Sequence, residues 1–461
     1  MTTGDEIVQE LPWRWRVQGR IFLIGGLGYL FDAWDVALNG FLTPLLGTEF
    51  GLSPGARGLV ASANLIGMAV GSVAWGTIAD RMGRKRAFAI TLLIFSVFSV
   101  LGAAAPSFWI FLVLRFAAGF GLGGCIPVDY ALVSEFSPRK QRGRVLAAMD
   151  LWWPIGATLC GLSATLLVPL SGNWRWMLLV MILPALLLFW VRRGVPESPL
   201  YLVRMGRERE AREVIDKLVA DTGAPVRPYE IPAPPEQPRA GALRSAVTQL
   251  RTVWSFDWRI TSVAWATFIT IMLLYYAALS WMPTILRTQG HGDAAAFAGT
   301  TVMSGLGIVG VIVSAALVDV VGRKWVIGIS APLASAALVG FALVLKVGGG
   351  TLVWLGVFGF LVQVAIPVLY AYVAELYPTT LRASGFGWAS ASSRVVTGFA
   401  PLLFGSVLWP TLGLPLTFTV LGVVVLAAVL WMAAAAPETK GRQLDHLSSD
   451  APSSAPAAVV E

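Results

Sequence analysis

Apolar segments long enough to cross a bilayer as helices recur along this chain of 461 residues, and they leave few other folds open. Only 13% of the residues are charged, which is too few to cover the surface of a soluble protein. We therefore predict an all-α membrane protein with twelve transmembrane helices. The predicted spans are residues 21–46, 57–78, 87–104, 108–134, 145–169, 174–193, 259–286, 296–318, 325–345, 352–376, 386–409 and 414–435.

Basic residues predict the orientation of these spans. The opposite loops hold only scattered charges such as Arg57, Arg287 and Lys346, whereas the loops after spans 2, 4, 8 and 10 are basic, with Arg81, Arg84, Lys85, Arg86, Arg139, Lys140, Arg142, Arg144, Arg323, Lys324 and Arg382. The positive-inside rule places these loops and both termini on the cytoplasmic side of a plasma or inner membrane. The formal net charge of +8 then reflects topology, and it needs no nucleic-acid partner to explain it.

A long loop divides the spans into six and six. We expect a cytoplasmic segment at 1–20, an N-terminal six-helix bundle at 21–193 and a C-terminal six-helix bundle at 259–435. The loop at 194–258 begins with an amphipathic helical pattern and continues as a Pro-rich linker. Residues 436–461 are expected to form a cytoplasmic, mostly disordered tail.

The two halves share sequence at three places. "IPVDYALVSEFSPRKQR" (126–142) and "IPVLYAYVAELYPTTLR" (366–382) agree at nine of seventeen positions, with an offset of 240. "ADRMGRK" (79–85) pairs with "VDVVGRK" (318–324), and "PES" (196–198) pairs with "PET" (437–439). The offsets agree within two residues, which indicates a duplicated six-helix unit. Such repeats around a midplane site are the usual construction of secondary transporters.

These motifs resemble those of the major facilitator superfamily. "GTIADRMGRKR" is similar to its signature loop between helices 2 and 3. "PESPLYL", "PETKG", "SEFSPRKQRGR" and "AELYPTTLRASG" resemble segments of its sugar-porter and organic-ion-transporter branches. "FDAWDVALNG" in the first span is most similar to nicotinate-transporter and synaptic-vesicle-protein-like members, and it also resembles aromatic-acid/proton symporters. The resemblance implies the fold of this superfamily, with two six-helix bundles and alternating access.

Charged residues at the predicted cytoplasmic helix ends repeat in both halves. We call this set the cytoplasmic latch: Asp80, Arg81, Arg84, Glu135, Arg142, Asp319, Arg323, Glu375 and Arg382. Ion pairs between helix ends can stabilise one global state and separate in another. The alternative is that these charges only anchor the helices at the membrane surface, although anchoring does not require acids.

Two aspartates, Asp32 and Asp35, lie inside the first apolar span, where a carboxylate is costly. The resemblance aligns Asp35 with the helix 1 aspartate of proton-coupled sugar porters and Arg115 with its helix 4 partner. Burial favours a neutral carboxyl and a nearby arginine favours a charged one. A pair that breaks in one state would therefore release or bind a proton, and Asp32 could share this role. The alternative is a static structural pair.

Arg394 stands where organic-anion members of the resembling branch have an arginine, and its planar fork suits a carboxylate. Further candidate substrate-binding residues are Trp34, Asn39, Asp129, Asp150, Trp153, Tyr275, Tyr276, Gln363 and Trp388. Each aromatic side chain could equally pack against lipid or core, and Asp129 and Asp150 could be structural acids. The seventh span lacks the paired glutamines and the asparagine with which sugar porters hold hydroxyls, which argues against a sugar substrate.

These observations predict a secondary active transporter for proton-coupled uptake of a small organic anion, for example an aromatic carboxylate such as nicotinate. Its expected partners are the substrate, protons and the lipid bilayer, and we expect a monomer. We find no catalytic set, metal-ligand cluster or phosphate loop, so we expect neither enzyme activity nor a cofactor. Three alternatives remain open: export of a hydrophobic or cationic compound, uncoupled facilitated diffusion, and a non-transporting receptor.

Overall fold

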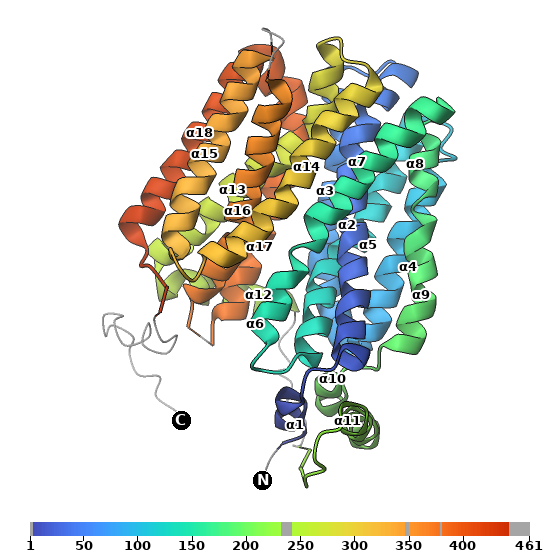
Figure 1. Cartoon of the computed structure of the whole chain (residues 1–461), viewed down its shortest axis with the longest axis vertical. Helices are drawn as coiled ribbons and strands as arrows, with labels where there is room; N and C mark the ends of the chain where they lie inside the picture. The colour runs from blue at the N-terminus through green and yellow to red at the C-terminus, as the bar shows by residue number, and fades with distance from the viewer. Residues whose placement is uncertain (1–2, 232–241, 346–349, 379, 442–461) are drawn as a thin grey trace.

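The computed structural model describes residues 3–231, 242–345, 350–378 and 380–441, and most of these are helical. Two bundles of long helices stand side by side (Figure 1). The N-terminal bundle contains α2 (Arg20–Glu49), α3 (Pro54–Met82), α4 (Arg84–Gly102), α5 (Phe108–Phe136), α6 (Arg142–Met149), α7 (Trp152–Ser171), α8 (Arg175–Leu179) and α9 (Ile182–Gly194). The C-terminal bundle contains α13 (Trp258–Thr288), α14 (Asp293–Leu317), α15 (Arg323–Val344), α16 (Thr351–Glu375), α17 (Arg382–Leu403) and α18 (Trp409–Ala435).

Within the described residues, ten helical segments are long and apolar enough to cross a membrane. The segment Arg382–Ala435 is one of them, although it holds two of the predicted spans. These are separated at Gly413, whose φ of 70° and ψ of 169° interrupt the helix. The sixth predicted span is built from α8 and α9, so its apolar helix, Arg175–Val191, is shorter than the others.

Large apolar side chains on the outside of the bundles are exposed. Examples are Val113, Leu170 and Phe189, which are 68%, 83% and 65% exposed. Contact of so many large apolar side chains with water would be unfavourable, whereas contact with lipid would not. The protein is therefore a multi-pass membrane protein.

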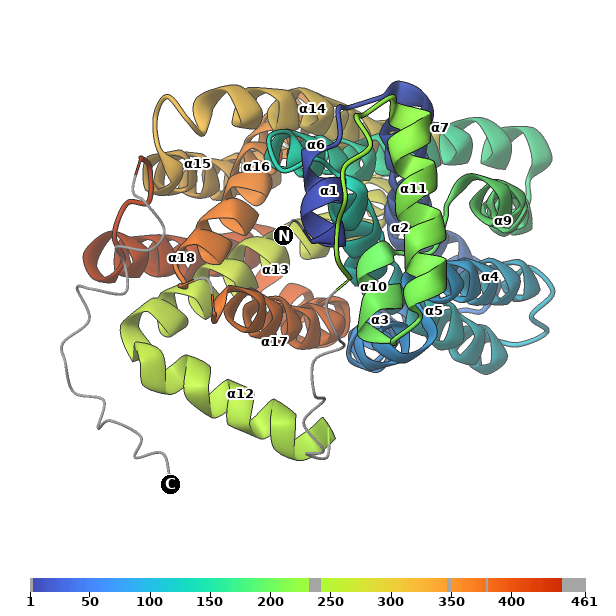
Figure 2. The same cartoon turned by 90° about the horizontal axis from the view of Figure 1, so that it is seen from below.

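Four further helices lie at one end of the bundles. α1 (Gly4–Glu10), α10 (Pro199–Arg204) and α11 (Glu208–Thr222) lie beneath the N-terminal bundle, and α12 (Ala242–Phe256) lies at the edge of the molecule near α17 (Figures 1 and 2). The predicted amphipathic pattern after residue 197 falls on α10 and α11. Residues 232–241 of the predicted linker and residues 442–461 of the predicted tail lie outside the described residues.

The bundles approach each other closely at the end opposite α1, α10 and α11, which we call the far end. A Cβ atom added at Gly40 of α2 would lie 2.3 Å from the carbonyl oxygen of Leu279 in α13. Arg287 of α13 donates to the carbonyl oxygen of Pro44 at 2.7 Å, and the amide of Leu402 donates to Ser62 Oγ at 3.1 Å. These contacts close the far end of the interface between the bundles.

Candidate functional site

Asp35 and Arg115 form an ion pair inside the N-terminal bundle. Arg115 Nη2 donates to Asp35 Oδ2 at 2.7 Å and Nη1 donates to Oδ1 at 3.0 Å, and both side chains are fully buried. The pair joins α2 to α5. Such a two-pronged pair is the strongest arrangement that arginine makes with a carboxylate.

Polar side chains from three helices complete this ion pair. Ser99 Oγ donates to Asp35 Oδ1 at 2.7 Å, and Asn64 Nδ2 donates to Asp35 Oδ2 at 3.3 Å. Arg115 Nε donates to Asn39 Oδ1 at 3.0 Å. Every partner of the Asp35 carboxylate is a donor, which is the arrangement that an ionised carboxylate needs. Asn39, a predicted substrate ligand, instead supports this pair.

A narrow cavity lies between the bundles. Its lining residues are Tyr29, Asp150, Trp153, Met272, Tyr275, Tyr276, Gln363, Ile366, Pro367, Tyr370 and Arg394. They come from α2, the turn between α6 and α7, the start of α7, α13, α16 and α17. The side chains leave room for only a few water molecules, so a substrate would enter after they move apart. A cavity shared by both bundles is where alternating access requires a site.

The cavity combines aromatic walls with polar groups. Trp153 Nε1 donates to the Tyr275 hydroxyl at 2.9 Å, and the Tyr130 hydroxyl donates to Asp150. Nη1 of Arg394 is buried and has no hydrogen-bond partner in the part of the chain that the structure describes. A buried guanidinium nitrogen without a partner is unfavourable, so an anion that paired with it would be stabilised.

The structure separates the sequence-predicted residues into three groups. Arg394, Asp150, Trp153, Tyr275, Tyr276 and Gln363 line the cavity. Asp32, Trp34 and Asp129 are buried outside its lining, and none of their side-chain nitrogen or oxygen atoms has a hydrogen-bond partner. Trp388 on α17 is half-buried and is not part of the lining either.

Sequence reasoning missed several cavity residues, including Tyr29 and Tyr370. Tyr370 had a signal, because it matches Tyr130 in the internal repeat and both hydroxyls lie near Asp150. It also missed Asn64 and Ser99 beside Asp35. Single polar residues in apolar spans occur throughout the chain, and their spacing does not reveal their partners.

The latch residues pair within each bundle. Arg84 contacts Glu135 at 3.5 Å, joining α4 to α5, and Arg323 contacts Glu375 at 3.0 Å, joining α15 to α16. Arg323 also contacts Asp319 at 3.2 Å. Arg142 donates to the carbonyl oxygen of Ser137. The other latch residues make no ion pair between the bundles in the part of the chain that the structure describes; the side chain of Asp80 lies outside it.

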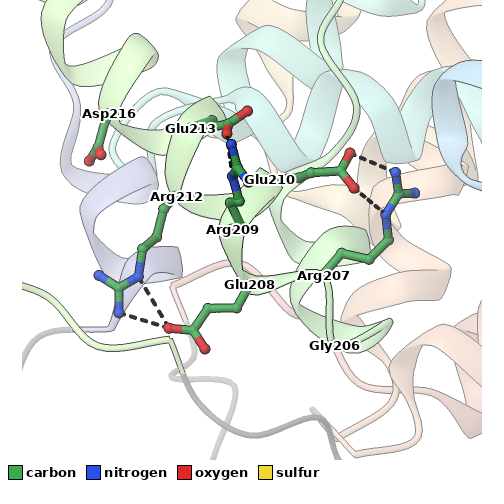
Figure 3. A pocket seen from close by; sticks show the side chains of 8 residues that line it. All are labelled: Gly206, Arg207, Glu208, Arg209, Glu210, Arg212, Glu213 and Asp216. Carbon is green, nitrogen blue, oxygen red and sulfur yellow. Dashed lines mark hydrogen bonds and ion pairs between the residues drawn. The ribbon is translucent and has the colours of Figure 1, made fainter.

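A second hollow lies on the outer surface of α11 (Figure 3). Its arginines and glutamates pair with one another, as Arg207 does with Glu210 at 2.6 Å and Arg212 with Glu208 at 2.9 Å. These pairs are solvent-exposed and follow helical spacing. The hollow is therefore a solvated helix face and not a substrate site.

Comparison with known proteins identifies the family. The family described as "Sugar (and other) transporter" matches residues 23–451. The chain belongs to this family. This member of the major facilitator superfamily is a transporter and not an enzyme, and the predicted superfamily fold is confirmed.

Two relatives and one solved structure show the range of this family. A niacin transporter of Acinetobacter baylyi is 33% identical over 425 residues, which cover 92% of this chain and 94% of that protein. A gallate transporter of Pseudomonas putida is 32% identical over 426 residues, or 91% of each chain. The inward-open xylose transporter XylE of Escherichia coli is only 19% identical, but it has a TM-score of 0.74 and covers 94% of this chain and 99% of its own.

Proposed function

We propose that this transporter takes up a small aromatic carboxylate together with a proton. The observation that carries the proposal is the unpartnered Nη1 of Arg394 in a cavity to whose lining tyrosine and tryptophan contribute five side chains. The guanidinium suits the carboxylate, and flat aromatic side chains suit a flat ring. Relatives named for niacin and gallate, both aromatic carboxylates, support the same substrate class.

Proton coupling is proposed from the buried ionisable residues of α2 and α5. Asp32, Asp35 and Arg115 are all at most 1% exposed, and carboxylates at this depth mark proton or ion pathways in transporters. We propose that they couple substrate uptake to the proton gradient. The latch pairs of the two bundles would then help to set which side of the membrane the cavity faces.

The orientation of the chain belongs to the same proposal. We place both termini and the basic loops in the cytoplasm of a cell membrane. Cysteines introduced beside Lys85 and Lys324 should then react with a membrane-impermeant maleimide from the cytoplasmic side only. Labelling of the two positions from opposite sides would contradict this topology.

The experiment that tests the function is transport by the purified protein in proteoliposomes. Nicotinate, gallate and 4-hydroxybenzoate are suitable radiolabelled probes, and nicotinamide is a neutral control. We expect counterflow of at least one acid, and its accumulation when the outside is acidic. Counterflow without accumulation would indicate facilitated diffusion. Preferred transport of organic cations would favour the alternative of a carrier for cationic compounds, with Asp32 and Asp35 as the substrate site. Absence of all counterflow would favour a receptor.

A further inference from the structure

We propose that Asp32, and not Asp35, is the group that takes up and releases the transported proton, in exchange for the substrate carboxylate at Arg394. The inference deepens the proposed function and rests on it. It assigns different roles to two aspartates that lie three residues apart on one helix, from differences in their partners.

Asp32 and Asp35 are equally buried but differ in every contact. The Asp35 carboxylate accepts hydrogen bonds from Arg115, Ser99 and Asn64. Neither carboxyl oxygen of Asp32, which is 1% exposed, has a partner. An ionised carboxylate cannot be held at such a position, so Asp32 carries a proton in this state. Removing the proton needs a new partner for the carboxylate.

Asp129 of α5 lies near Asp32 and also lacks hydrogen-bond partners among the described residues. Both of its carboxyl oxygens are buried without a partner. A Cβ atom at Gly28 would lie 2.9 Å from Asp129 Oδ2, and Gly28 precedes Asp32 by one helical turn on the same face. The two carboxyl groups therefore meet between α2 and α5. By the argument made for Asp32, Asp129 also carries a proton, so both carboxyl groups are neutral in this state.

Ionisable groups on four helices lie close enough to Asp32 to interact with it electrostatically. They are Asp35 on α2, Cys125 and Asp129 on α5, Tyr276 on α13 and Arg394 on α17. Arg394 is the cation among them, and it belongs to the opposite bundle. Its Nη1 has no hydrogen-bond partner among the described residues, as expected if Asp32 is protonated. A metal site is not indicated, because no group of His, Cys, Asp and Glu among the described residues could hold one.

From these two unpartnered groups we infer an exchange of partners at Arg394. In the empty carrier, ionised Asp32 pairs with Arg394 across the interface between the bundles. A proton from outside neutralises Asp32 and frees the guanidinium, to which the substrate carboxylate then binds. After the carrier reorients, the substrate leaves, Asp32 gives its proton to water, and its carboxylate returns to Arg394. One proton crosses with one carboxylate, so transport of a monoanion is electroneutral.

The test compares Asp32→Asn, Asp129→Asn and Asp35→Asn in proteoliposomes, with nicotinate, gallate and 4-hydroxybenzoate as probes. Asp32→Asn fixes the neutral form, so counterflow should continue and lose its dependence on pH. Accumulation driven by a pH gradient should disappear. Asp129→Asn replaces a neutral carboxyl by a neutral amide, so it should keep both the accumulation and the pH profile of the wild type. Asp221→Asn, on the exposed face of α11, is the matched control and should behave as the wild type.

Infrared spectroscopy gives a readout that needs no substrate. The C=O stretch of a protonated carboxyl should be present in the purified wild type at neutral pH. It should be weaker in Asp32→Asn and unchanged in Asp35→Asn. Equal band intensity in Asp32→Asn and the wild type would overturn the inference.

The outcomes separate the inference from the function on which it rests. If the wild type gives no counterflow with any probe, the proposed function fails. If the wild type accumulates an acid and Asp32→Asn does so equally well, only the assignment of the proton to Asp32 fails. Loss of coupling in folded Asp35→Asn, with coupling intact in Asp32→Asn, would assign the proton to Asp35 instead.

Discussion

At the residue scale, the substrate assignment depends most on Arg394. It is the cationic member of a cavity lining that also contains the carboxyl group of Asp150. An arginine and an acid in one cavity could orient a substrate that carries a carboxylate at one end and a hydrogen-bond donor at the other. Charge selection by Arg394 is therefore the first property to measure.

Arg394→Ala should weaken binding of a transported acid by roughly ten- to a hundredfold, because a charge-assisted hydrogen bond contributes about 1.5–3 kcal/mol. Arg394→Lys should restore only part of this, since lysine offers no planar fork. Competition with radiolabelled acid measures the affinities. The neutral amide of the same acid is the control, and its weak binding should hardly change. Equal losses of affinity for the acid and the amide would mean that Arg394 has a structural role in its helix and does not bind the charge of the substrate.

The sequence predicted the Asp35–Arg115 pair through its resemblance to proton-coupled porters, but it could not predict the surroundings of the pair. Asn39 was expected in the substrate site, and it contacts Arg115 instead. Asn64 and Ser99 were not predicted at all. A polar residue in an apolar helix indicates that a partner exists, but which helix provides the partner depends on packing between distant segments.

Breaking the Asp35–Arg115 pair from one side should destabilise the fold. Arg115→Gln leaves a buried carboxylate without its partner, which costs about 3–5 kcal/mol. Asp35→Asn leaves the opposite charge unpaired, and the double variant should be more stable than the sum of the two losses implies. Thermal unfolding in detergent measures these effects. Arg209→Gln, in the exposed pair with Glu213, is the control and should change stability by less than about 0.5 kcal/mol.

At the element scale, one part of the internal repeat, at residues 79–85 and 318–324, forms the same helix N-terminus in both halves. Gly83 and Gly322 have φ values of 100° and 105°, and each precedes the first residue of a helix, α4 or α15. The amide of Lys85 donates to Glu197 at 3.1 Å, and the amide of Lys324 donates to Glu438 at 2.9 Å. The sequence predicted that the motifs of the first half correspond to those of the second. It did not predict that, in each half, the glutamate of the PES or PET motif accepts a hydrogen bond from the backbone of the GRK motif.

Glu438 provides a pH-dependent test of this helix start. Burial opposes its ionisation, but backbone donors from Lys440, Lys324, Arg323 and Thr439 outweigh burial and lower its pKa. Because the pKa of Glu438 is lower in the folded than in the unfolded protein, its carboxylate stabilises the fold at pH values above the unfolded pKa. This stabilisation is lost as the pH falls through the folded pKa.

Glu438→Gln should therefore lower stability at neutral pH by about 1 kcal/mol, a typical value for a lost charge at a helix start. The difference from the wild type should disappear in strong acid, where Glu438 is protonated as well. Melting temperatures measured across pH check this. Glu213→Gln, at an exposed position, should show little difference at any pH. If the loss of stability in Glu438→Gln is the same at every pH, the shape of the Glu438 side chain and not its charge stabilises this helix N-terminus.

At the scale of the whole molecule, the bundles are closed at the far end. The sequence predicted two bundles, because hydrophobic periodicity and the repeat belong to each half separately. It could not predict the state, since one sequence must support every state of the transport cycle and the contacts between the halves change. Gly40 and Gly58 allow the bundles to come close together in the closed state, because neither has a side chain. Cβ atoms added there would lie 2.3 Å from Leu279 O and 2.5 Å from Pro401 O.

Gly40→Leu should therefore prevent closure of the far end, because its side chain would overlap the backbone of α13 at Leu279. We expect transport to fall at least tenfold, the effect of about 1.4 kcal/mol on the equilibrium between states. A cysteine at Ser280, which is 7% exposed, should become reactive toward a membrane-impermeant maleimide added outside. The measurement uses a background in which the buried Cys125 and Cys160 are replaced by alanine.

Gly76→Leu is the matched control, because a Cβ atom there meets nothing within 4 Å, and its transport and labelling should match the background protein. If Gly40→Leu transports normally, close approach of α2 and α13 is not part of the cycle. If its labelling rises while transport persists, the far end opens without controlling turnover. Lost transport together with faster labelling from outside would instead show that the bundles must touch at Gly40 for the carrier to face the cytoplasm.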